Sequence, residues 1–128
     1  MIKFYFPQDI TNLKPYVPAD LLGKDLLMVA EEDGLVKAVC CFYYQNTAAD
    51  IHAVIPCHES TGLLILDGLI RSALFHMAEL DCISATVEKV PAVLSDHLIR
   101  LGFELQGDRL CCDDFPGVLF SGCESCKT

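Results

Sequence analysis

Four side chains that can do acid–base or nucleophilic chemistry lie within eight residues of one another: His52, Cys57, His58 and Glu59. A histidine or a glutamate can act as a general base that takes a proton from a reacting group, directly or through a water molecule. We therefore predict His58 and Glu59 as catalytic residues. A solvated loop pair without a catalytic role is the alternative interpretation.

Cys57 allows a different chemistry. It follows a predicted strand and precedes a predicted helix, a setting that can lower a thiol pKa and produce a nucleophile. The alternative is an inert thiol, because adjacency in the sequence does not direct the side chains of Cys57 and His58 toward each other.

The end of the chain carries a CxxC motif, Cys123 and Cys126. A structural zinc site usually takes four ligands, and Cys111-Cys112 lacks the spacing of a second pair. Metal binding, redox pairing and tail thiols without a role therefore remain three interpretations. Residues 122–128 are expected to form a flexible tail.

Hydrophobic patterning predicts the elements that must position these residues. Strands are predicted at residues 1–6, 25–31, 35–45, 50–55, 82–88 and 103–111, the last with a turn at 107–108, and a seventh at 117–121. Helices are predicted at residues 9–13, from a cap at Ser60 or Thr61 to residue 80, and at 92–101. This order predicts a mixed sheet with helices on its faces.

Composition bounds the class of protein. The 128 residues predict one domain, 1–128, and 52% are apolar, which is enough for a core. The formal net charge of -9 argues against nucleic acid as a partner. Without a long apolar run or a secretory signal, we expect a cytoplasmic protein that does not enter a membrane. In that compartment the eight cysteines are expected to be free thiols, with Cys40, Cys41 and Cys82 buried.

The order of elements and several local matches resemble the GNAT superfamily of acyltransferases. The matches are Val54 and Pro56 at the end of the fourth strand, Gly62 near the next helix start, and the run LIRLGF at 98–103. The resemblance covers nearly the whole chain. It implies an α/β (α+β) fold, with a mixed, mostly antiparallel sheet of six to seven strands and helices on both faces.

The same resemblance implies acetyl-CoA as the cofactor. In the superfamily the pantetheine pairs with the fourth strand, and the pyrophosphate rests on the loop that opens the next helix, where free N–H groups and the helix dipole favour an anion. The implied cofactor-binding residues are Ala53, Val54, Ile55, Ser60, Thr61, Gly62, Leu63 and Leu64. The implied partner is a small-molecule or peptide amine acceptor, and a homodimer is a further expectation.

Four positions depart from the superfamily pattern. Glu59 stands where Arg or Gln is usual, Leu64 where Gly or Ala is usual, Leu98 where a tyrosine acid is common, and Pro91 where an asparagine is common. Two functions therefore stay open: an acetyl-CoA-dependent N-acetyltransferase, and a catalytically inactive GNAT-like binding or interaction module.

Overall fold

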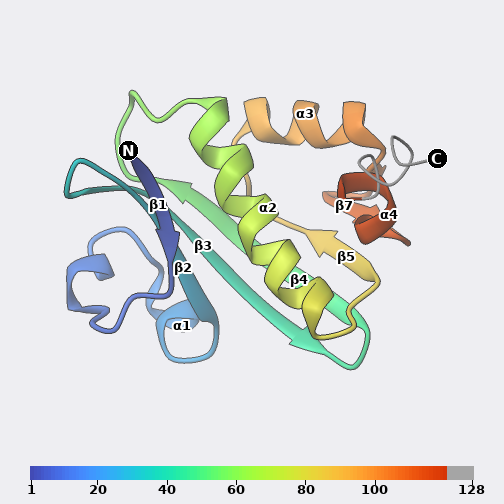
Figure 1. The fold of residues 1–128 in the computed structure, drawn as a ribbon, viewed down its shortest axis with the longest axis horizontal. Coiled ribbons are helices and arrows are strands. Elements are labelled where there is room, and N and C mark those ends of the chain that lie inside the picture. Colours follow the sequence, from blue (N-terminus) through green and yellow to red (C-terminus); the bar gives the residue numbers. More distant parts are fainter. Residues whose placement is uncertain (121–128) are drawn as a thin grey trace.

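A seven-stranded mixed sheet forms the centre of the protein (Figure 1). The computed structural model describes residues 1–120. The strands are β1 Ile2–Tyr5, β2 Leu26–Glu32, β3 Leu35–Gln45, β4 Ala48–Pro56, β5 Ser84–Val87, β6 Glu104–Gln106 and β7 Arg109–Cys112. Their order across the sheet is β1-β2-β3-β4-β5-β7-β6, and β4 and β5 are its parallel pair. The predicted mixed, mostly antiparallel sheet is thereby confirmed.

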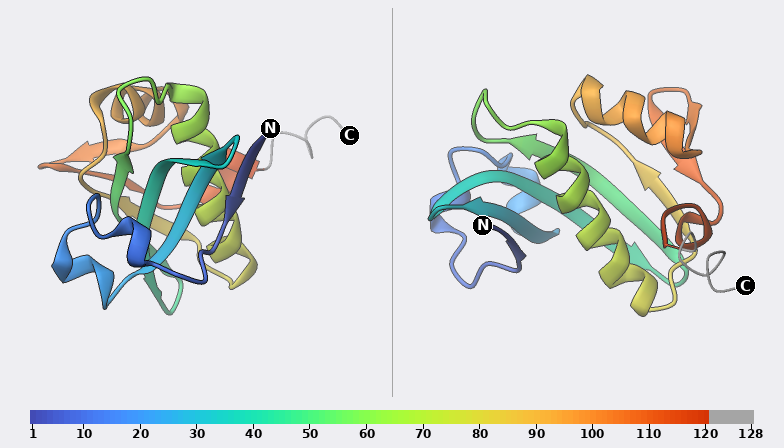
Figure 2. Two further views of the ribbon diagram at one scale, coloured as in Figure 1. Left: turned by 90° about the vertical axis from the view of Figure 1, so that its left-hand side faces the viewer. Right: turned by 45° about the horizontal axis from the view of Figure 1, so that its top comes forward.

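Helices cover both faces of this sheet. They are α1 Ala19–Leu22, α2 Leu63–Glu79, α3 Ala92–Leu101 and α4 Phe115–Phe120, with a short 3-10 helix, η1, at Thr11–Leu13. Helix α2 runs across one face with α3 beside it (Figure 1), and the segment that carries α1 lies on the opposite face (Figure 2). The long connection through α2 is what allows β4 and β5 to lie parallel.

Strand alternation divides the buried side chains between two hydrophobic clusters. The larger cluster lies under α2 and α3 and includes Phe42, Ile51, Leu69 and Leu98. The smaller cluster lies under η1 and α1, where Leu13 and Val17 pack against strand residues. Cys40, Cys41 and Cys82 are each at most 1% exposed, and the six cysteines among residues 1–120 are free thiols, as predicted.

The end of α3 agrees with the sequence-based expectation. Gly102 has a φ of +128°, and the Phe103 N–H donates to the Leu98 carbonyl oxygen at 3.0 Å. This pattern closes the helix and turns Phe103 into the core, where it is 2% exposed.

Three local predictions were wrong. Residues 117–121 were expected to form a strand, but α4 occupies this region because the Asp114 carboxylate accepts the Gly117 N–H at 3.0 Å, as a helix-capping side chain does. The helix expected at residues 9–13 is only the 3-10 turn η1, and a second short helix, α1, follows Pro18. The cap of α2 is Gly62, without a side-chain hydrogen bond, rather than Ser60 or Thr61.

Two further observations bear on the earlier expectations. Within residues 1–120, every helix is too short or too polar to cross a lipid bilayer. The CxxC motif of Cys123 and Cys126 and the tail 122–128 lie outside the described residues.

Candidate active site

Strand β4 continues beyond the point where β5 ends. The parallel register between the two strands stops at the pair Ile51 and Val87, while β4 runs on to Pro56. Beyond that pair, one backbone contact joins the Val54 N–H to the Lys89 carbonyl oxygen at 3.3 Å. From His52 onward, β4 therefore has no paired strand on the side of β5 among residues 1–120.

A β-bulge lies at this residue. In the pairing of β3 with β4, Cys41 faces Ala53 and Phe42 faces Ile51, so His52 is the extra residue. A bulge bends a strand and changes the direction of a side chain, and bulges are frequent beside active sites. Here the extra residue places His52 on the same face of the sheet as Ala53, the face that α1 covers.

On that face His52 meets an acidic residue that is distant in the sequence. The Asp25 Oδ2 lies 2.6 Å from the His52 Nδ1, and the side chains of Asp25 and His52 are 4% and 31% exposed. Asp25 is held just after α1 by its backbone N–H, which donates to the Leu21 carbonyl oxygen at 3.0 Å. The pair thus joins α1 to the bulge of β4.

The nearly buried carboxylate also determines which ring nitrogen is available. An ionised carboxylate only accepts hydrogen bonds, so the His52 Nδ1 carries the hydrogen and donates it to Asp25. The Nε2 of the neutral ring then has a free lone pair, and no other residue among 1–120 forms a hydrogen bond with it. A histidine held by a carboxylate in this way is suited to act as a general base.

A pocket of about 280 Å³ opens beside this pair. Its lining residues are Leu21, His52, Glu88 and Lys89. They come from α1, from the bulge of β4 and from the segment that follows β5. The partly exposed imidazole therefore faces a space that a small ligand can enter.

The loop from β4 to α2 holds the other predicted site residues. The Thr61 hydroxyl donates to the Lys37 carbonyl oxygen at 2.9 Å, which ties the loop to β3. Because Gly62 caps α2 without a side chain, the first N–H groups of this 17-residue helix have no side-chain acceptor. Such a helix start favours an anion.

His58 and Glu59 lie in this loop, and neither forms a hydrogen bond or ion pair with His52 among residues 1–120. The Nε2 of His58 is buried and lacks a hydrogen-bond partner among these residues, whereas Glu59 is exposed. The catalytic roles predicted for His58 and Glu59 remain predictions.

The predicted cofactor-binding residues of β4 face different edges. Val54 directs its N–H toward the edge that β5 leaves, where it meets Lys89. Because neighbouring residues of a strand direct their backbone groups to opposite edges, Ala53 and Ile55 direct theirs toward β3. In α2, Leu63 is half-buried and Leu64 is 79% exposed.

Cys57 is unsuited to act as a nucleophile, and Leu98 is unsuited to act as a proton donor. Burial raises the pKa of the half-buried Cys57 thiol to about 11, so it is protonated at neutral pH and is a poor nucleophile. Leu98, at the position where the superfamily often has a tyrosine, is 1% exposed and belongs to the core.

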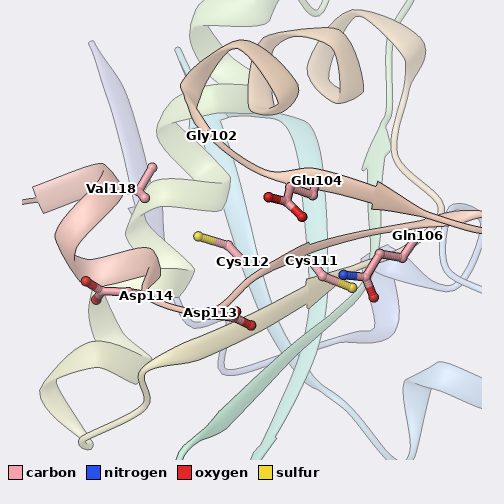
Figure 3. A pocket seen from close by; sticks show the side chains of 8 residues that line it. All are labelled: Gly102, Glu104, Gln106, Cys111, Cys112, Asp113, Asp114 and Val118. Carbon is pink, nitrogen blue, oxygen red and sulfur yellow. The ribbon is translucent and has the colours of Figure 1, made fainter.

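A second pocket, of about 220 Å³, lies between α4 and the hairpin of β6 and β7 (Figure 3). Cys111, Cys112 and three carboxylates line it together with Gly102, Gln106 and Val118. Burial raises the pKa of the Cys112 thiol. Among residues 1–120, no group of three or more His, Cys, Asp or Glu side chains has the arrangement that a metal ion needs.

Sequence reasoning considered His52 but did not select it, and it missed Asp25 as its partner. Asp25 lies 27 residues before His52 and was placed at the start of a strand. Neither the bulge nor a contact across this separation leaves a periodic signal in the sequence. The alternation of polar and apolar residues in β4 was the one available indication that His52 faces away from the α2 side.

Comparison with solved structures identifies the class of fold. A GNAT family acetyltransferase from Brucella melitensis, crystallised with acetyl-CoA, superimposes with a TM-score of 0.64 at 16% identity, over 88% of both chains. A putative GNAT family acetyltransferase from Desulfovibrio desulfuricans gives 0.67 at 12% identity, over 87% of this chain and 96% of that one. The PaiA N-acetyltransferase from Thermoplasma acidophilum, in complex with coenzyme A, gives 0.56 at 16% identity, over 68% of this chain but only 58% of the other.

These likenesses show that the chain has the GNAT fold, and the resemblance inferred from the sequence is confirmed at that level. No protein-family model matches the sequence, and no curated protein matches it either.

Proposed function

We propose that this protein is an acetyl-CoA-dependent N-acetyltransferase whose acceptor is a small amine. The observation that carries the proposal is the Asp25–His52 pair at the point where β4 leaves β5, beside a pocket. The resemblance to the superfamily implies that the acyl donor enters this opening of the sheet, so a base at His52 would lie beside the thioester.

The described residues offer acetyl-CoA an open strand edge and a free helix start. The Val54 N–H points to the edge of β4 beyond the end of β5, where it meets the Lys89 carbonyl oxygen at 3.3 Å. The start of α2, whose first N–H groups have no side-chain acceptor among residues 1–120, follows the loop after β4. Hydrogen-bond donors there would hold the phosphate groups, with Ser60, Thr61, Gly62 and Leu63 as the proposed contacts.

Acetyl-CoA supplies an acetyl group activated as a thioester. The Nε2 of His52 takes the proton from the acceptor's ammonium, and Asp25 stabilises the resulting imidazolium. The amine nitrogen then forms a C–N bond with the acetyl carbon while the C–S bond breaks. The sulfur leaves as the thiolate and takes up the second proton that the nitrogen loses. Holding amine and thioester together supplies much of the acceleration.

Binding of acetyl-CoA, with CoA and ATP as comparisons, is the first test. At a ligand concentration about a hundredfold above Kd, the free energy of unfolding should rise by about 2.7 kcal/mol, which a thermal-shift measurement detects easily. Transfer is then measured as CoA thiol release with a panel of amines. If acetyl-CoA at millimolar concentration leaves the melting temperature unchanged, the proposal fails.

A catalytically inactive binding module is the second candidate. It is favoured by Glu59 in place of a basic or amide residue, by the exposed Leu64 at a position where a small residue is usual, and by the burial of Leu98 in the core. Acetyl transfer to any amine of the panel, lost in His52→Gln, would rule out this candidate.

A further inference from the structure

The pocket beside His52 presents two opposite charges to a ligand. Glu88 and Lys89 are consecutive residues directly after β5, and both line the pocket. Neither side chain forms a hydrogen bond or an ion pair with any residue among 1–120. A carboxylate and an ammonium group are therefore both available to a ligand at one site.

The backbone fixes the place of these two residues. The Glu88 N–H donates to the Ile51 carbonyl oxygen at 2.8 Å, and the Lys89 carbonyl oxygen accepts the Val54 N–H at 3.3 Å. These two contacts bracket the bulge that carries His52. The charged segment and the imidazole are thus held by the same part of β4.

Lys89 also has an unusual conformation. Its φ is +42°, in the left-handed region that costs a residue with a side chain about 1 kcal/mol. In an extended strand, consecutive side chains point to opposite sides. The left-handed turn at Lys89 breaks that alternation and allows Glu88 and Lys89 to line one pocket.

We propose that the acceptor is a small amino acid or a similar short molecule with one ammonium and one carboxylate group. This inference rests on the proposed function and deepens it. The acceptor's ammonium lies between His52 and Glu88, and its carboxylate pairs with Lys89. Because the amine faces His52, the proton that it loses during acetylation passes to the His52 Nε2.

The size and polarity of the pocket restrict the acceptor further. At about 280 Å³ the pocket is slightly smaller than the usual range for ligand sites, and Leu21 supplies its apolar wall. A polyamine would bring a second cation toward Lys89, and the amide group that follows a peptide's N-terminus would leave Lys89 without an anion. A molecule with one charge of each sign satisfies both side chains.

The test measures binding separately from transfer. The backbone amide signals of Glu88 and Lys89 and the His52 ring signal are followed by NMR during titration with glycine, alanine, serine, β-alanine and γ-aminobutyrate, and with the corresponding amides. We expect at least one of these acids to bind about tenfold more tightly than its amide, because the amide cannot form the charge-assisted contact with Lys89. Lys89→Gln should remove this difference, whereas Lys24→Gln, a change at an exposed lysine outside this pocket, should preserve it.

Equal binding of acids and amides, an unchanged difference in Lys89→Gln, or no response to any of these compounds would overturn the inference. Acetyl transfer is measured in parallel on the same compounds. Selective binding of an acid without transfer would support the class of ligand inferred for this pocket and count against the proposed acetyltransferase. Transfer to acids and amides at equal kcat/KM would support the proposed acetyltransferase and contradict the inference about its acceptor.

Discussion

The Asp25 carboxylate lies 2.6 Å from the Nδ1 of His52, and the Asp25 side chain is only 4% exposed. The pair joins the segment that follows α1 to a bulge in the middle of β4. A nearly buried carboxylate at this distance orients the imidazole ring. This relationship makes His52 the strongest candidate for a general base among residues 1–120.

Substitution of this pair should affect the rate of acetyl transfer. We expect His52→Gln to lower kcat by roughly 10²–10⁴, the usual contribution of a positioned acid–base group. Asp25→Asn should lower it by about 10–100, because an amide no longer fixes the tautomer of the ring. Steady-state kinetics on proteins checked for folding would measure both.

Asp50→Asn is the matched control for this pair, because Asp50 lies on the same strand without a side-chain partner among residues 1–120. It should leave kcat within about twofold, as expected for a residue that takes no part in acid–base chemistry. If His52→Gln also retains kcat within that margin, the base lies elsewhere, and the predictions for His58 and Glu59 become the next to test.

Glu59→Gln should increase the affinity for acetyl-CoA. Glu59 is exposed in the loop before α2, where it would repel a pyrophosphate group. The expected gain is a few-fold, or about 0.5–1 kcal/mol, and it should shrink at high salt because exposed charges are screened. Isothermal titration calorimetry at two ionic strengths measures this change.

Glu79→Gln, at the exposed far end of α2, is the control for the loss of one negative charge. Equal effects of the two substitutions would mean that the anion does not bind near Glu59. The same Glu59 variant tests the predicted catalytic role, since an unchanged kcat would remove Glu59 as the base.

Gly62→Ala separates folding from binding. Gly62 has an extended conformation with a φ of -95°, and a Cβ atom there would meet nothing within 4 Å. The substitution should therefore change the free energy of unfolding by only about 0.5 kcal/mol. If the pyrophosphate approaches this backbone closely, the added methyl group should still weaken acetyl-CoA binding.

Gly102→Ala should, in contrast to Gly62→Ala, cause a clear loss of stability. Its φ of +128° is strained for any residue with a side chain, so we expect a loss of about 1 kcal/mol or more in urea unfolding. Comparable losses of stability in the two variants would contradict the conformations described for these glycines.

The buried thiols should make the protein sensitive to alkali. Burial raises the pKa of Cys57 to about 11, and burial together with the Asp25 charge raises that of Cys41 to about 12. A raised pKa in the folded state means that unfolding releases protons above the usual thiol pKa near 9. The contribution of each thiol to stability is therefore complete below about pH 9 and lost as pH rises toward 11–12.

Urea unfolding between pH 8 and pH 11.5 measures this loss. Cys57→Ala should make the free energy of unfolding fall less steeply over this pH range. Other groups that titrate at alkaline pH will still contribute. At pH 8, alkylation of Cys57 should be about a hundredfold slower than that of an ordinary thiol, because its thiolate fraction is smaller by about that factor. Fast alkylation of Cys57 at pH 8 would restore the nucleophile interpretation.

A polar network joins the three helices on the α2 side. Both carboxylate oxygens of Asp67 accept from the Arg71 Nε at 2.9 Å, and the Nε2 of His97 lies 3.0 Å from Asp67 Oδ1. Arg71 also donates to the Leu119 carbonyl oxygen of α4 at 3.3 Å. Asp67→Asn should lower the free energy of unfolding by about 1 kcal/mol, the scale of a partly exposed ion-pair network.

Asp96→Asn, at an exposed position of α3, serves as the comparison and should have an effect below about 0.5 kcal/mol. Chemical denaturation at the same pH measures the free energy of unfolding of the two variants. Equal stability of the two would show that the Asp67 network contributes no more than an ordinary surface charge.

The sequence by itself determined the class of fold and the order of most elements, with α1 and α4 as the exceptions. Periodicity predicted β3 and α3 with the bounds that the structure has, and the pair Gly102-Phe103 predicted how α3 ends. These features depend on local backbone preferences and on hydrophobic spacing, which a linear pattern records. The same reasoning failed at α4, because six residues are too few to separate a helical from a strand period.

The tertiary structure decided the candidate site. The bulge at His52 depends on the register between β3 and β4, and the contact with Asp25 depends on α1 folding over that face. The left-handed turn at Lys89 depends on its attachment to β4. Each is a contact between segments far apart in the chain, and hydrophobic periodicity carries no information about such a contact because it describes only neighbours along one element.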